Sequence, residues 1–129
     1  MVQQNEDSSW KTLQICCQAL DDKKAGDLKI LGVQEVSSVT DYFVIATGTS
    51  VPHLRALTEE LKASLKEAGI RTLGSESATE SGWNVVDAFE VIVHVFLPEV
   101  REQYRLDTLW KDGELIEPQK VIPDYVSEG

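Results

Sequence analysis

The sequence predicts an α/β fold: a single domain in which a mixed β-sheet is flanked by helices. Stretches with apolar residues at helical spacing alternate along the chain with runs rich in β-branched and aromatic residues. Their order is helix, two strands, helix, further strands and helix, which is typical of one sheet with helices packed against it. The 129 residues suffice for one hydrophobic core and not for two. We therefore predict one domain over residues 1–118 and a loose tail over 119–129, where periodicity fades.

The first helix is predicted within SSWKTLQICCQALDDKKAGD, residues 8–27. Ser8 or Ser9 is suited to cap its start, and Gly26 is suited to end it. Its apolar stripe consists of Trp10, Leu13, Cys17 and Leu20.

The two cysteines, Cys16 and Cys17, are adjacent in this helix. Neighbouring side chains diverge on a helix, so a disulfide between them would be strained. No further Cys or His cluster accompanies them, and we predict reduced packing residues, one on the apolar face and the other less buried.

Two β-rich runs follow, over residues 28–36 and 42–47, joined by a polar connection. This pattern predicts a β-hairpin. Gly32 lies inside the first run and is predicted to mark a β-bulge.

The second helix is predicted to begin after Ser50 as N-cap, with Pro52 in its first turn and Gly69 as its stop. The apolar face of the helix consists of Leu54, Leu57, Leu61, Leu65 and Ala68. Beyond the helix, residues 70–73 predict a short strand and residues 74–82 an irregular polar segment.

The remaining elements are two strands and a third helix. Residues 83–97 predict two strands around a turn at residues 88–90. Pro98 is suited to open a helix that has an acidic residue in its first turn. The side chains predicted to face inward from this segment are Val100, Tyr104, Leu106, Leu109 and Trp110.

The charge of the chain is strongly acidic, −10 in total. Residues 76–129 hold 12 acidic and 4 basic side chains, and therefore −8 of that charge. This balance disfavours a nucleic-acid partner, because phosphate backbones require clustered Lys and Arg. It fits either a basic protein partner or a surface charge that serves solubility. No apolar run is long enough to cross a bilayer, so we expect no membrane partner.

The chain begins with MVQQNEDSSW, which has neither a basic leader with an apolar core nor an Arg-rich transit peptide. We therefore expect a cytoplasmic location.

The turn between the second strand and the second helix raises the question of catalysis. Backbone N–H groups at Gly48, Thr49 and Ser50, next to a helix N-terminus, are able to hold an anion. Neither the phosphate-loop lysine nor the G-x-G-x-x-G pattern is present. A nucleotidyl-transferring enzyme also needs paired carboxylates to hold magnesium, and Phe89 stands two positions after Asp87 where the second carboxylate would be. We prefer a structural interpretation of this turn over a catalytic one.

The two histidines do not form a metal site. His53 lies in the first turn of the second helix, within reach of Asp41 or Asp87, and His94 alternates with Ile92 along one strand. Neither has a Cys, Ser or carboxylate at a fixed short spacing, so we expect two hydrogen-bonded structural histidines and neither a metal nor a cofactor.

Three runs together resemble the iojap, or ribosomal silencing factor, family: DYFVIATGTSVPH, WNVVDAFEVIVHVF and REQYRLDTLW. Their order and spacing match the family pattern from about Trp10 to Trp110. The resemblance implies a fold related to nucleotidyltransferases that lacks their catalytic carboxylates. It also implies a protein without enzymatic activity. Because relatives of the family are often dimeric, it further implies that the free protein can be a homodimer.

The function implied by the resemblance is binding to the basic protein numbered fourteen of the large ribosomal subunit, which blocks joining of the small subunit and damps translation. A role in large-subunit maturation has also been proposed for relatives. Two alternatives stay open: a nucleotidyltransferase-like enzyme that uses the Gly-Thr-Ser turn, and a general acidic adaptor for another basic protein.

The chain departs from the family pattern at one turn, where Phe89 and Glu90 replace the usual Gly-Asp. A bulky residue tolerates positive φ poorly, so we expect a different turn geometry here. Trp83, Val85, Asp87 and Phe89 share one face if the strand is regular, and there aromatic anchors accompany a carboxylate that needs a partner. The residues that we assign to partner binding are Trp83, Val85, Asp87, Phe89, Glu90, His94, Arg101 and Tyr104. The turn of the family motif consists of Thr47, Gly48, Thr49, Ser50 and His53.

Overall fold

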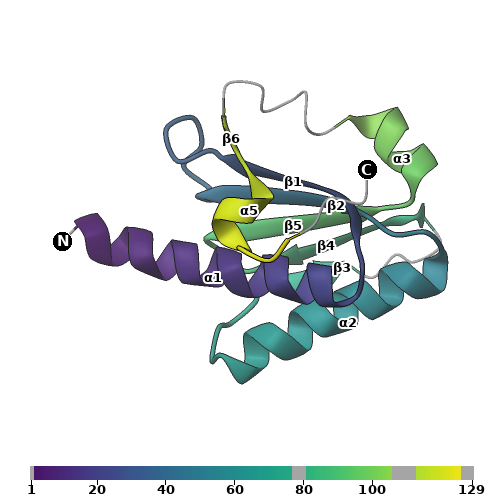
Figure 1. Cartoon of the computed structure of the whole chain (residues 1–129), viewed down its shortest axis with the longest axis horizontal. Coiled ribbons are helices and arrows are strands. Elements are labelled where there is room, and N and C mark those ends of the chain that lie inside the picture. Colours follow the sequence, from purple (N-terminus) through teal and green to yellow (C-terminus); the bar gives the residue numbers. More distant parts are fainter. Residues whose placement is uncertain (1, 77–80, 106–112, 126–129) are drawn as a thin grey trace.

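A computed structural model of the chain describes residues 2–76, 81–105 and 113–125, and within 2–7 and 74–76 it describes the backbone. The fold is a six-stranded sheet in the order β3-β4-β5-β2-β1-β6. β2 and β5 run parallel and all other neighbouring strands are antiparallel, so the predicted mixed sheet is confirmed (Figure 1). The strands are β1 (Gly26–Gly32), β2 (Tyr42–Thr47), β3 (Gly74–Glu76), β4 (Trp83–Asp87), β5 (Val91–Phe96) and β6 (Glu114–Ile116).

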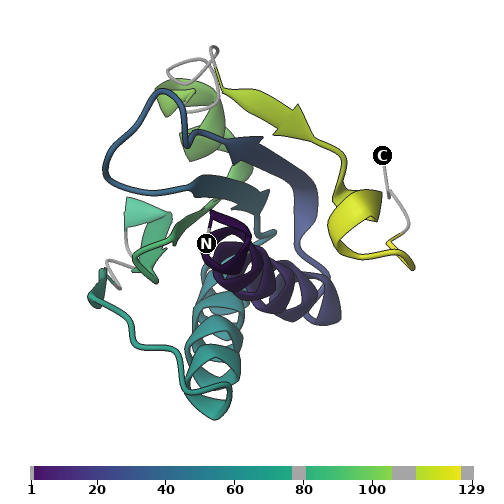
Figure 2. The ribbon, with the colours of Figure 1, turned by 90° about the vertical axis from the view of Figure 1, so that its left-hand side faces the viewer.

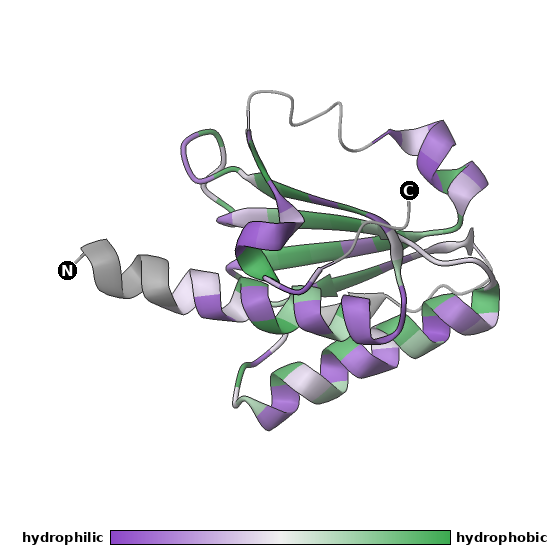
Figure 3. Ribbon diagram, in the orientation of Figure 1, coloured by the Kyte–Doolittle hydropathy of each residue, from purple (hydrophilic) through white to green (hydrophobic). Residues whose placement is uncertain are grey.

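Two long helices, α1 (Val2–Asp22) and α2 (Val51–Glu67), lie side by side on one face of the sheet (Figures 1 and 2). The surfaces that they turn to the sheet are hydrophobic, whereas their outer surfaces are polar (Figure 3). The main core lies between these helices and the sheet, and its fully buried members include Leu13, Leu57, Leu61, Val44, Val86 and Val93. This burial is the main stabilising contribution to the fold.

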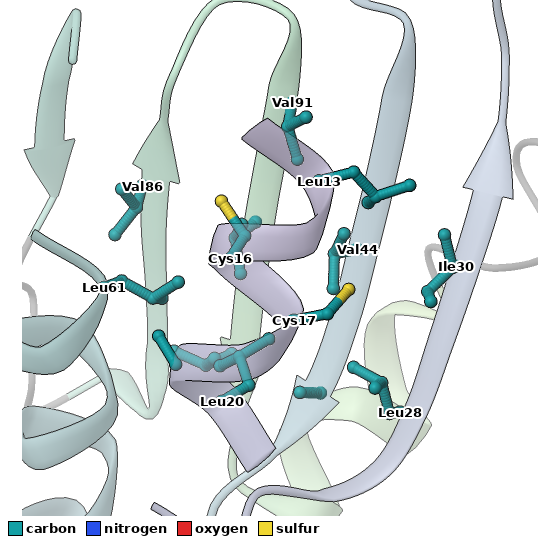
Figure 4. Packing of buried hydrophobic residues seen from close by; sticks show 14 of the residues in the cluster. Leu13, Cys16, Cys17, Leu20, Leu28, Ile30, Val44, Leu61, Val86 and Val91 are labelled. Carbon is teal, nitrogen blue, oxygen red and sulfur yellow. The ribbon is translucent and has the colours of Figure 1, made fainter. Parts of the chain in front are cut away.

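Both cysteines are buried in that core and neither is in a disulfide. Cys16 lies on the side of α1 nearer Leu61 and Val86, whereas Cys17 lies on the side nearer Val44 (Figure 4). The prediction of one less buried cysteine is therefore wrong, because α1 packs against α2 as well as against the sheet. Burial raises the pKa of the Cys16 thiol to about 12 and that of Cys17 well above its usual range, so both are protonated at neutral pH.

The ends of α1 differ from the prediction. The helix begins at Val2 instead of after Ser8 or Ser9, and the Ser9 hydroxyl, inside the helix, donates a hydrogen bond to the Asp41 carboxylate. It ends at Asp22, and the residue with a left-handed conformation after it is Lys24, φ 61°, whereas Gly26, predicted to end the helix, is the first residue of β1.

The hairpin of β1 and β2 is confirmed, but its details differ. β1 ends at Gly32, and the next residues turn as the Ser37 N–H donates to the Val33 carbonyl. The irregularity in the register lies between Gly26 and Lys29, where Asp27 has φ 46°. Gly32 pairs regularly with both neighbouring strands, so the bulge predicted there is wrong.

Helix α2 has the predicted start and buried face. Ser50 accepts a hydrogen bond from the His53 N–H at 3.2 Å, Pro52 lies in the first turn, and Gly69 follows with φ 76°. Ala68 is exposed instead of inward, because it is the C-cap where the helix leaves the core. The buried residues are Leu54, Leu57, Thr58, Leu61 and Leu65.

The short strand after α2 is β3, at residues 74–76, and not at 70–73. The Leu73 N–H donates to the Asp87 carbonyl, and Gly74 pairs with Asp87 in register. β3 therefore pairs with the end of β4. β4 begins directly after residues 74–82, the segment that was predicted to be irregular.

The third helix, α3 (Pro98–Tyr104), begins at the predicted proline. Val100 packs against the sheet, but Tyr104 is 49% exposed, so its predicted inward position is wrong. Leu106, Leu109 and Trp110 lie outside the described residues.

The predicted loose tail is also wrong in its described part. α5 (Pro118–Val121) follows β6, and Val121 and Ile122 are each only 3% exposed in the main core. β6 pairs with β1 and thereby directs the chain toward α1, against which α5 packs.

Candidate functional site

The sheet surface opposite α1 and α2 is the strongest candidate for a functional site. Alternation along β4 and the first part of β5 separates a buried side, which faces the helices, from a half-buried side. Trp83, Val85 and Asp87 share the half-buried side as predicted, whereas Phe89, predicted on the same face, lies in the turn after β4. In register, Val85 lies opposite His94, and Asp87 lies opposite Ile92. We define the open face as six of the half-buried residues on this side: Phe43, Trp83, Val85, Asp87, Ile92 and His94.

Among the described residues, α3 is the helix that packs on this side, and it does so at one end. Trp83 contacts the buried Phe96 with ring centroids 5.0 Å apart and the exposed Tyr104 of α3 at 4.8 Å. At the other end, Phe43 lies 5.6 Å from the His94 ring. Aromatic rings thus join the strands into a continuous apolar surface with a few polar groups.

His94 is hydrogen bonded, as predicted for a structural histidine, because the Trp83 Nε1–H donates to its Nδ1 at 3.1 Å. Burial lowers the pKa of His94 to about 4, and the nearby Asp87 carboxylate opposes this only partly. The imidazole is therefore neutral at physiological pH, and Asp87 carries the charge of the open face.

Asp87 is not paired with His53. Its Oδ1 accepts a hydrogen bond from the Phe89 N–H at 2.8 Å, in the turn between β4 and β5. Phe89 has φ 67°, so the expectation that a bulky residue avoids positive φ here is wrong. The Asp87 carboxylate and the bond from the Glu90 N–H to the Ala88 carbonyl, 2.7 Å, hold the turn in this conformation. The Phe89 side chain is 49% exposed at the end of the sheet.

Glu90 points to α1 and away from the open face. Its carboxylate accepts from the Ser9 hydroxyl at 3.2 Å and from Ser8 at 3.3 Å, and Ser9 also donates to Asp41. These contacts fix the start of β2 and the β4–β5 turn against the helix. The assignment of Glu90 to partner binding therefore does not follow from this geometry.

Arg101 also serves the fold. Its guanidinium donates to the Asp27 carbonyl at 2.6 Å and to the Thr47 Oγ1 at 2.8 Å, and lies 3.6 Å from the Asp27 carboxylate. The Arg101 side chain is only 11% exposed. It attaches α3 to the strand ends and places Tyr104 beside Trp83, so its effect on the open face is indirect.

The Gly-Thr-Ser turn uses the backbone donors of Gly48 and Thr49 internally. The Gly48 N–H donates to the Phe96 carbonyl at 2.8 Å, and the Thr49 N–H donates to His53 Nδ1 at 2.9 Å. The other ring nitrogen of His53 bonds to the Lys23 carbonyl at 2.7 Å, and neither Asp41 nor Asp87 is its partner. A Cβ on Gly48 would lie 2.7 Å from Leu54 Cδ2. These contacts favour the structural interpretation, in which small residues let the strand and helix meet closely.

Two residues of the open face were missed by sequence reasoning. Phe43 and Ile92 are paired in register between β2 and β5. The signal that identifies them is strand alternation combined with the parallel pairing of β2 and β5, and that pairing is not evident from the sequence. In the described part of the chain no group of three His, Cys, Asp or Glu side chains is placed to hold a metal ion.

The fold and the open face define a small mixed α/β protein with an aromatic surface on one side of its sheet. Residues 6–128 match the family described as ribosomal silencing factor during starvation. The chain belongs to this family, as the three sequence runs predict.

Known relatives agree in sequence and in structure. The ribosomal silencing factor of Halalkalibacterium halodurans is 35% identical over 115 residues, which cover 89% of this chain and 98% of that protein. That of Bacillus subtilis is 39% identical over 103 residues, covering 80% and 87%. A crystal structure of a Chromobacterium violaceum protein superposes with a TM-score of 0.75 at 37% identity, covering 78% of this chain and 84% of that one.

A more distant relative is the mouse protein named mitochondrial assembly of ribosomal large subunit protein 1. It is 35% identical over 91 residues, which cover 68% of this chain and 40% of that protein. Within the described residues, no helix is long and apolar enough to cross a membrane.

Proposed function

We propose that this protein is a ribosomal silencing factor that binds the large ribosomal subunit through its basic protein numbered fourteen and sterically blocks joining of the small subunit. Family membership supports a ribosome-associated role in silencing translation. The name of the mouse relative refers to the large subunit, which favours that subunit as the binding partner. The single observation that carries the proposal is the open face itself.

The open face has the composition of a protein interface. Trp83, Phe43 and Ile92 offer apolar area, and the aromatic contacts with α3 preorganise Trp83. Asp87 lies at the edge of this area and presents a carboxylate to a basic partner, while its hydrogen bond to the Phe89 N–H holds it in place. Binding of this kind requires neither a cofactor nor turnover.

The acidity of the chain supports a basic partner. The net charge of −10 raises the rate of encounter with a positively charged protein and disfavours direct contact with ribosomal RNA. Steric occlusion then needs only that a folded domain of 14.4 kDa occupy the intersubunit surface. We place this activity in the cytoplasm, and we propose that the free protein forms a homodimer, as relatives of the family often do.

Neither alternative function gains support from the geometry. The N–H groups of Gly48 and Thr49 have internal partners, so the turn offers a phosphate few free donors. A general acidic adaptor would have no specific partner, whereas the family relationship supports a role on the ribosome.

The experiment that tests the proposal is co-sedimentation of the protein with isolated large subunits, small subunits and joined ribosomes. We expect the protein to pellet with free large subunits, and with neither small subunits nor joined ribosomes. Val85→Arg, which places a charge on the open face, should abolish this binding. The matched control is Ala68→Arg at the exposed C-cap of α2, which adds the same charge away from that face and should bind normally. Equal binding by both variants, or pelleting with small subunits, would contradict the proposal.

A further inference from the structure

The interaction between Trp83 and His94 determines which hydrogen-bonding group the open face presents. An indole Nε1–H is only a donor, so His94 Nδ1, which it contacts at 3.1 Å, must be the acceptor. A neutral imidazole carries one proton, and that proton is therefore on Nε2. The tautomer of His94 thus follows from its neighbour.

The Nε2–H group has no partner among the described residues. Among the described residues, the hydrogen bond of the His94 side chain is the one from Trp83, and its aromatic ring contacts are with Phe43, Phe96 and Trp83. Among the described residues, the buried side-chain atom that lacks a hydrogen bond is Asn84 Oδ1, and His94 Nε2 is not such an atom. His94 Nε2 is consequently in contact with solvent, on a face that is otherwise mostly apolar.

We infer that His94 is a specificity-determining residue of the open face, and that its Nε2–H donates a hydrogen bond to an uncharged acceptor, a main-chain carbonyl, of the bound ribosomal protein. The inference rests on the proposed function. A partner that covers the apolar face removes water from this N–H, and a buried donor without an acceptor is strongly unfavourable. The partner must therefore supply an acceptor at this point.

The charges around His94 favour a neutral acceptor over a carboxylate. Asp87 is near enough to act electrostatically on the ring, and the whole chain carries −10. A second carboxylate brought to this position would be repelled by both. A partner with a basic surface can still present a backbone carbonyl, which has no net charge.

Two substitutions separate the hydrogen bond from the shape of the side chain. His94→Phe keeps a ring but removes the donor, whereas His94→Gln keeps an acceptor for Trp83 and an N–H donor. With isolated large subunits, we expect His94→Phe to weaken binding about tenfold or more and His94→Gln to recover most of that loss. The folded state of each variant is checked by thermal unfolding before the binding titration.

A second measurement reads the tautomer directly. In the free protein, ¹⁵N NMR of the imidazole should show Nε2 protonated and Nδ1 unprotonated. Binding of the isolated ribosomal protein should protect the Nε2–H proton from exchange with water. The inference is overturned if Nδ1 carries the proton, if folded His94→Phe binds as well as the original protein, or if His94→Gln loses as much affinity as His94→Phe. Failure of the unmodified protein to bind large subunits would instead refute the proposed function, and the inference with it.

Discussion

The charge of Asp87 can be removed without disturbing the turn that it stabilises. Asp87→Asn retains a side-chain oxygen that can accept the 2.8 Å hydrogen bond from the Phe89 N–H. It leaves His94 neutral, because the Asp87 carboxylate raises the pKa of His94 and its loss lowers that pKa further. The variant should therefore unfold at nearly the same temperature as the original protein.

The expected loss of binding follows from the position of this carboxylate. Exposed ion pairs contribute about 1 kcal/mol or less, whereas removal of one partner from a desolvated pair costs roughly 2 to 5 kcal/mol. Asp87 is half-buried and borders the aromatic surface, so we expect a loss in the desolvated range, which is at least about thirtyfold in affinity.

The matched control is Glu114→Gln, which removes the same charge from β6. Glu114 is exposed and pairs with Gly32, whereas the next residue, Leu115, pairs with Leu31 of the open side. Strand alternation therefore directs Glu114 away from the open face. Titration of the isolated ribosomal protein against each folded variant, at fixed salt, should show a large loss for Asp87→Asn and a loss below about threefold for Glu114→Gln. Equal losses would show that total charge, and not the open face, governs association.

Three further predictions concern the fold. The pKa of His94 is lowered from 6.5 to about 4, so the unfolded chain binds more protons than the folded chain between these pH values. The free energy of unfolding should therefore fall by about 3 kcal/mol as the pH falls through this window. In His94→Gln, chemical denaturation should show little of this pH dependence. Gly48→Ala should lower the free energy of unfolding by about 1 to 3 kcal/mol, because the added methyl group meets Leu54, and an unchanged melting temperature would contradict this packing. Cys16 and Cys17 should resist alkylation by iodoacetamide until the protein is denatured, and rapid labelling in native buffer would refute their burial.

Local sequence signals predicted the elements whose formation depends on local chemistry. Ser50, Pro52 and Gly69 bound α2 because capping and backbone conformation act within a few residues. Alternation along β4 placed Trp83, Val85 and Asp87 on one side for the same reason. The three family runs are also local patterns, and they led to the family that the comparisons show.

The features that the sequence did not predict depend on contacts between residues far apart in the chain. Glu90 is turned to α1 by Ser8 and Ser9, which lie 82 and 81 residues away in the sequence. Arg101 is held by Asp27 at a separation of 74 residues. The tail folds because β6 pairs with the distant β1. No period or turn signal reports such pairings, and Phe89 shows that a carboxylate two residues earlier can stabilise a conformation that intrinsic preference disfavours.

Steric occlusion of the small subunit can be measured in a subunit-joining assay. Large subunits are incubated with the protein, small subunits are added, and the joined fraction is measured by sucrose-gradient sedimentation as the concentration of the protein rises. We expect the joined fraction to fall in proportion to the occupancy of the large subunit. We expect Val85→Arg, which disrupts the open face, to leave the joined fraction unchanged. A joined fraction that stays unchanged while the large subunits are saturated with the protein would contradict steric occlusion.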